Sequence, residues 1–94
     1  MDNYEAHSML QDQLTRLRGQ RYKQLLRFLN GPVGVEVLGQ SGISYSIEIE
    51  AMWDCKAYRD LRVSVSIDDG SLLRAVVPLN QDFIIRPDGS FVGE

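Results

Sequence analysis

The sequence has little cysteine and histidine and lacks any long hydrophobic run. Its 94 residues include one cysteine, Cys55, and one histidine, His7. A single cysteine excludes an internal disulfide. Cys55 and His7 together cannot supply the four ligands of a usual Cys/His zinc site. No stretch approaches the roughly 18 apolar residues of a membrane span, and the N-terminus lacks the basic and apolar regions of a secretory signal. We therefore expect a cytoplasmic protein with no cofactor, no metal and no membrane contact.

The size of the chain and its charge pattern indicate one domain with two electrostatically different parts. With 44% hydrophobic and 24% charged residues, residues 1–94 are predicted to form a single globular domain. Residues 1–30 carry five cations against three carboxylates, a net charge of +2, whereas residues 31–94 carry five against ten, a net of −5. Nucleic-acid binding draws mainly on phosphate neutralisation, so the acidic larger part argues against it.

Residues 1–30 have the apolar periodicity of an amphipathic helix. Good helix formers separate apolar residues spaced by threes and fours. Gly31 and Pro32 supply the stop signal. The apolar positions are Met9, Leu10, Leu14, Leu17, Tyr22, Leu25, Leu26, Phe28 and Leu29.

After Pro32 the apolar period changes to two, which is typical of half-buried strands. In "ISYSIEIE" and "LRVSVSI" the apolar and polar side chains alternate. The segments predicted as strands are 33–39, 43–50, 61–67 and 72–79, with a short terminal pair at 83–86 and 91–92. Because their connections are short, neighbouring strands should be antiparallel. The sequence thus predicts an α+β fold in which the helical segment covers a mainly antiparallel meander of four or five strands within residues 33–94.

A continuous helix would be too long for this sheet. Residues 4–30 would span ~40 Å, whereas strands of six to eight residues reach only ~20–27 Å. The apolar direction of the helix also changes at Gly19. Either the helix bends at Gly19 and folds back, or its first half, with Leu10, Leu14 and Leu17, packs on a second copy. Of the two, we predict the homodimer.

Glu48 and Glu50 form the most suggestive pair of chemical groups. Two carboxylates at i and i+2 on one strand face can act as general acid and base, or bind a hard cation. The same face should also carry cations such as Arg62 or Arg74, which would neutralise them across the sheet. We interpret the pair as part of a solvated polar face, with a catalytic or metal site as the alternative.

The segment 53–60, "WDCKAYRD", is the best candidate for a contact surface. We expect 54–60 to be a true loop that carries Tyr58 and Arg59, because exposed aromatics and arginine anchor many protein contacts. Trp53 either joins this surface or closes the edge of the core.

The last residues read as a closing hairpin. In the sequence 86–89, "RPDG", proline and glycine have the backbone preferences that a tight turn requires, and aspartate can hydrogen-bond its own backbone. Phe83, Ile85 and Phe91 flank this turn as apolar residues. The Asp-Gly pair is therefore predicted to be a turn and not a site.

The second half of the chain resembles a group of short bacterial proteins of unknown function. The resemblance is carried by "IEIEAMWD", "DLRV", "IDDG" and "DFIIRPDGSFVGE" and covers roughly residues 43–94. It implies a bacterial origin and a compact α+β fold, and it supplies no activity or site residues.

Taken together, these features predict a non-enzymatic protein-interaction module that binds itself, another protein, or both. An immunity or antitoxin-like protein is one concrete version, because an acidic surface can cover the basic site of a toxin. The alternative is a small enzyme, or a metal or ligand binder, that uses Glu48 and Glu50 in a cleft between two copies.

Overall fold

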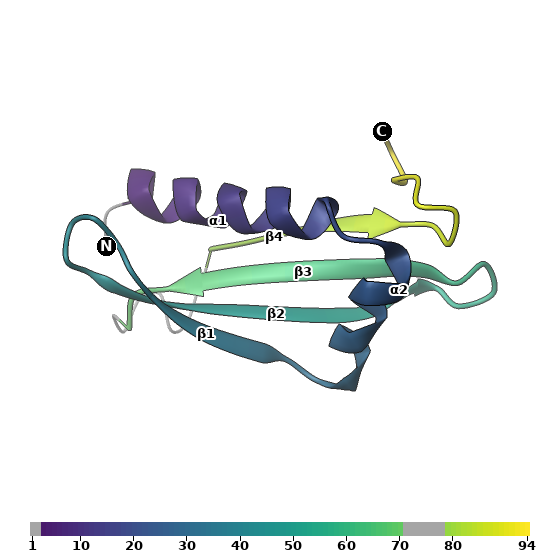
Figure 1. Cartoon of the computed structure of the whole chain (residues 1–94), viewed down its shortest axis with the longest axis horizontal. Coiled ribbons are helices and arrows are strands. Elements are labelled where there is room, and N and C mark those ends of the chain that lie inside the picture. The colour runs from purple at the N-terminus through teal and green to yellow at the C-terminus, as the bar shows by residue number, and fades with distance from the viewer. Residues whose placement is uncertain (1–2, 71–78) are drawn as a thin grey trace.

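The structure, a computed structural model, describes residues 3–70 and 79–94. Among these residues it has a helical layer on one side of an antiparallel sheet (Figure 1). The elements are α1 (Asn3–Arg18), α2 (Tyr22–Leu25), the 3-10 helix η1 (Leu26–Asn30), β1 (Val33–Leu38), β2 (Ser44–Cys55), β3 (Asp60–Asp68) and β4 (Leu79–Ile85). The predicted α+β fold is confirmed.

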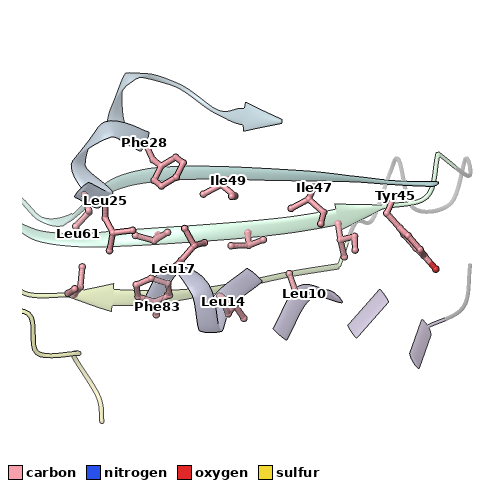
Figure 2. Close-up of a cluster of buried hydrophobic side chains, with 14 of the residues drawn as sticks. Leu10, Leu14, Leu17, Leu25, Phe28, Tyr45, Ile47, Ile49, Leu61 and Phe83 are labelled. Carbon is pink, nitrogen blue, oxygen red and sulfur yellow. The ribbon is translucent and has the colours of Figure 1, made fainter. Parts of the chain in front are cut away.

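The sheet is a meander in which each strand pairs with the next along the chain. Its order is β1-β2-β3-β4, and all three pairings are antiparallel. The register places Ile47 of β2 between Val35 of β1 and Ile67 of β3, so odd-numbered residues share one face. This inner face carries most of the core (Figure 2): Tyr45, Ile47, Ile49, Leu61, Val63, Val65, Ile67, Phe83 and Ile85 are buried there. The strand predicted at 72–79 lies outside the described residues except for Leu79.

The helical segment breaks at Gly19, as the change in apolar direction indicated. The Gly19 N–H bonds back into α1, to the carbonyls of Thr15 and Arg16 at 3.2 Å each, and the Gln20 N–H follows, to the Leu17 carbonyl at 3.0 Å. Arg21 is extended, with φ −74° and ψ 152°, and redirects the chain into α2. The break redirects the chain, so that α1 packs on β3 and β4 while η1 packs on β2.

The prediction that the first half of the helix extends beyond the sheet toward a second copy is wrong. Leu10, Leu14 and Leu17 are only 1%, 7% and 3% exposed. They lie between α1 and the sheet of their own chain (Figure 2). Because the bend lets α1 fold over the sheet, these leucines belong to the core and are not available to a partner.

The helical layer covers the inner face of the sheet unevenly. α1 packs on β3 and β4, and η1 packs on β2. Val33 and Val35 of β1 belong to the inner face by register, yet they remain 43% and 47% exposed. Leu38, at the end of the same strand, is 72% exposed. At the β1 edge of the sheet, the helices therefore leave these three apolar side chains largely uncovered.

The expected loop at 54–60 is shorter than the sequence suggested. β2 continues to Cys55 and β3 begins at Asp60, so only residues 56–59 form the turn. Trp53 pairs with Leu61 and Cys55 with Asp60, and the register shifts between these two pairs. Such an irregularity keeps a strand paired past the point where its alternation fails, which the pattern alone does not reveal.

The C-terminal hairpin closes against α1 as predicted. The Gly89 N–H donates to the Arg86 carbonyl at 2.9 Å, and Phe91 bridges back to Ile85. The Phe91 ring meets Phe83 edge to face, with centroids 5.7 Å apart, and the Arg18 guanidinium lies 4.2 Å from the Phe91 centroid. The hairpin therefore adds an aromatic contact and a cation–π contact to one end of the core.

Removing residues 88–94 should destabilise the whole domain. Loss of the half-buried Phe91 and its contacts should cost roughly 2 kcal/mol, or about 10 °C in Tm for a domain of this size. Thermal unfolding followed by circular dichroism measures the change. Deletion of residues 93–94 alone is the control, since it removes little more than the exposed ion pair between Arg18 and Glu94. A chain lacking 88–94 that melts like the full chain would refute this account of the hairpin.

Candidate functional site

The outer face of the sheet is polar, acidic and open. The helices lie against the opposite face (Figure 1). Even-numbered strand residues point outward, and they include four serines that give the face a row of hydroxyl groups, Ser44, Ser46, Ser64 and Ser66. The charged members on β1 to β4 include Glu36, Glu48, Glu50, Asp54, Arg62 and Asp82. Carboxylates thus predominate among these charges.

Glu48 and Glu50 line a shallow hollow in this face. The register sets Glu48 opposite Ser66 and Glu50 opposite Ser64. Asp82 of β4 lies opposite Ser64 on the other side. The hollow, of about 300 Å³, is lined mainly by these side chains together with Asn80 and Gln81. Its oxygen atoms suit a ligand that donates hydrogen bonds or carries positive charge.

Arg62 does not neutralise the two glutamates, contrary to the expectation from alternation. Its guanidinium donates to Asp54 at 2.6 Å and to Asp82 at 2.8 Å. These two bonds, that to Asp54 first, raise the pKa of Arg62 above its ordinary value. The register explains the difference, since Arg62 stands opposite Met52 and Ile84, beyond the glutamates.

The two glutamates stand apart from the ion pairs on this face. Among the described residues neither Glu48 nor Glu50 forms an ion pair, while Arg74, another cation of the sheet region, lies outside them. Within residues 3–70 and 79–94, no group of three or more His, Cys, Asp or Glu side chains is placed to hold a metal ion. On this acidic face Glu48 is exposed and Glu50 is half-buried.

The predicted contact residues of the β2–β3 hairpin differ in their surroundings: two contact each other and one projects into solvent. The Arg59 guanidinium lies 4.8 Å from the Trp53 ring centroid, so these two side chains contact each other. Arg59 has a φ of 61°, and its carbonyl accepts a hydrogen bond from the Tyr22 hydroxyl at 2.7 Å. Tyr58, at the tip, is 76% exposed. Trp53 and Arg59 thus help to fix the hairpin against α2, and Tyr58 is the side chain that projects from it.

A second exposed feature, the open edge at β1, was not among the predicted contact residues. Val33, Val35 and Leu38 are all more than a third exposed on this strand. A groove of about 430 Å³ continues the apolar surface between α1 and β1, where Met9 and Val37 line its wall. The alternation of "VGVEV" predicts a strand, but it does not indicate whether the helical layer extends far enough to cover that strand.

A set of hydrogen bonds near the start of α1 was also not predicted from the sequence. The Glu5 carboxylate accepts hydrogen bonds from the Ser41 hydroxyl at 2.6 Å, the Ser41 N–H at 3.0 Å and the Tyr45 hydroxyl at 2.8 Å. These bonds, the one from the Ser41 hydroxyl above all, hold the pKa of Glu5 below its ordinary value. A Cβ on Gly39 would come within 2.4 Å of a Glu5 carboxylate oxygen, so the glycine makes room for this contact.

Replacing Glu5 with glutamine should destabilise the fold in a pH-dependent way. A carboxylate whose pKa is lowered on folding contributes stability above its unfolded pKa, near 4.5, and loses it as the pH falls through the folded value. We expect Glu5→Gln to lower Tm at pH 7, and the difference from the natural chain to narrow as the pH falls below 4.5 and the carboxylate becomes protonated. Asp12→Asn, at an exposed position on the same helix, is the control and should change Tm little. A difference that stays constant from pH 7 to pH 3 would contradict the role assigned to the charge.

Comparison with known proteins adds no further constraint. No protein-family model, curated protein or solved structure matches the chain. In the described part of the chain, no helix is both long enough and apolar enough to cross a membrane. The function must therefore be argued from the two exposed surfaces, the acidic outer face and the open β1 edge.

Proposed function

We propose that this chain is a non-enzymatic, homodimeric protein-binding module whose outer sheet face holds a basic surface of another protein. The observation that carries the proposal is the charge of that face. Glu48, Glu50 and Glu36 share it, and Arg62 is already held by two aspartates. Among the described charges of this face carboxylates outnumber cations, which favours a cationic partner and speeds its association.

The shape of the face also suits a protein partner. Serine hydroxyls between the carboxylates add hydrogen-bond donors and acceptors, and the hollow at Glu48 and Glu50 gives a partner's basic side chain a place to insert. An immunity or antitoxin protein of the bacterial cytoplasm would use such a face to cover the basic site of a toxin. This is the cellular role we propose.

Capture from an extract of the source organism tests the proposal. Immobilised natural chain should retain a protein with a basic surface, and rising salt should release it because the contact is electrostatic. The double variant Glu48→Gln/Glu50→Gln should lose at least about tenfold in affinity for the captured protein, measured by titration.

A charge-matched control distinguishes the effect of the outer-face carboxylates from that of the total negative charge of the molecule. Asp12→Asn/Glu94→Gln removes the same charge from the helical side of the molecule and should bind like the natural chain. Equal weakening by both double variants would show that total charge, and not this face, governs binding. Failure of the natural chain to retain any basic protein would overturn the proposal.

The hollow between Glu48 and Glu50 supports a second candidate, a small enzyme or a metal or ligand binder. If a hard cation bound there, millimolar Mg²⁺, Ca²⁺ or Mn²⁺ would raise Tm, and Glu48→Gln/Glu50→Gln would abolish the rise. The protein-binding proposal expects no cation-dependent rise and a small effect of the double variant on stability, because both side chains lie on the outer face. A rise that the variant removes would favour the second candidate.

A further inference from the structure

The hydrogen-bonding direction along β1 leaves an open ladder at the edge of the sheet. The Gly39 N–H donates to the Ile43 carbonyl of the neighbouring strand at 2.8 Å. Backbone groups alternate in direction along a strand, so Val37, Val35 and Val33 also bond toward β2. The N–H and C=O groups of Gly34, Glu36 and Leu38 therefore point away from the sheet.

The other edge of the sheet is partly closed by the chain itself. Beyond β4, the Val92 N–H donates to the Ile84 carbonyl at 2.9 Å, and Phe91 bridges to Ile85. On the β1 edge, none of the backbone hydrogen bonds between described residues outside the sheet ladders involves Gly34, Glu36 or Leu38. The two edges thus differ: the chain itself occupies β4 near Ile84 and Ile85, whereas none of these bonds occupies the outward groups of β1.

β1 also lacks the usual protection of an open edge. Such strands are commonly guarded by outward lysines, prolines or bulges. The charged residue of β1, Glu36, turns back onto its own sheet, where its carboxylate accepts bonds from Ser46 at 2.6 Å and Ser44 at 3.3 Å. Pro32 stands just before the strand, so it limits the ladder at one end without blocking it.

From these features we infer that β1 pairs antiparallel with β1 of a second copy, with Val35 on the twofold axis. In this register Val35 faces Val35 of the other copy, Val33 faces Val37, and Gly34 faces Glu36. The apolar positions of "VGVEV" are symmetric about Val35, and a twofold interface requires such self-complementarity. Two four-stranded sheets then form one continuous sheet.

Other registers of the pairing between the two β1 strands are less favourable. A shift that brings Glu36 opposite Glu36 would place like charges face to face. A shift that pairs an odd position with an even one would set the valines of one copy against the polar face of the other. In the favoured register glycine stands opposite each glutamate, so the carboxylate keeps its bonds to Ser44 and Ser46. The valine rows lie beside each other, which shields the exposed sides of Val33 and Val35.

The pairing also limits its own growth. Once the two β1 strands have met, the remaining edges of the joined sheet are the β4 edges, which the C-terminal hairpins partly close. A closed twofold dimer is therefore expected instead of an open fibre.

The inference gives the proposed homodimer its interface and can be tested separately from the binding of a basic partner. Sedimentation velocity of the natural chain over a concentration series should show a monomer–dimer equilibrium. Val35→Lys places two ammonium groups on the axis and should raise the dimer dissociation constant at least about tenfold. Met52→Lys is the matched control, because Met52 is also 47% exposed but lies on β2, outside the strand that would pair. It should dimerise normally.

Cysteine cross-linking tests the register even if the lysine variant fails to fold. In a chain with Cys55→Ser, the added change Val35→Cys brings two thiols opposite each other across the axis, where strand spacing permits a disulfide. Mild oxidation should convert this variant to a covalent dimer, whereas Val33→Cys, which faces Val37, should cross-link far more slowly.

Three outcomes would overturn the inference. They are a natural chain that stays monomeric at all concentrations, a dimer that Val35→Lys leaves intact, and Val35→Cys cross-linking no faster than Val33→Cys. The second and third would leave a homodimer with another interface. Because Glu48→Gln/Glu50→Gln should dimerise normally, capture of a basic protein reports on the outer face whatever the result at β1.

Discussion

One helix is too narrow to cover four strands, and most of this structure depends on that mismatch. A helix with its side chains is ~10–12 Å across, whereas four strands spaced ~4.8 Å apart, with their side chains, present a wider surface. Leu10, Leu14 and Leu17 set α1 over β3 and β4, and η1 packs on β2. On β1, Val37 reaches the core, but Val33 and Val35 are left largely uncovered. The central strands are covered by the helical layer, and the β1 edge is left open to the association that we propose.

The features that could be predicted from the sequence are those that neighbouring residues determine. The two-residue period fixed β2 and β3, the change of apolar direction located the break at Gly19, and Pro-Asp-Gly identified the last turn. What could not be predicted depends on residues far apart in the chain. The Glu5 contacts join residues that are 36 and 40 positions apart. The partners of Arg62 depend on the strand register, and the alternating pattern would fit equally well if a strand were shifted by two residues. The exposure of β1 depends on where the helix comes to rest.

The outer face and the β1 edge fit a single mode of action. Pairing through β1 would place the outer faces of the two copies in one continuous sheet, with Glu36 of each close to the axis. A partner with an extended or repeated basic surface could then contact both copies, and a second contact made after the first is intramolecular. The association of the chain with itself would thereby strengthen its hold on another protein without any additional side chain.

The packing of α1 against β3 and β4 also has a consequence for synthesis. α1 ends at Arg18, yet the strands that bury its leucines end at Asp68 and Ile85. At a ribosomal rate of ~5–20 residues per second, several seconds separate the first from the last of these elements. During that interval the newly made helix has nothing in its own chain to cover its apolar stripe. The domain can therefore bury this stripe only after β3 and β4 have been synthesised, so its core forms late in synthesis.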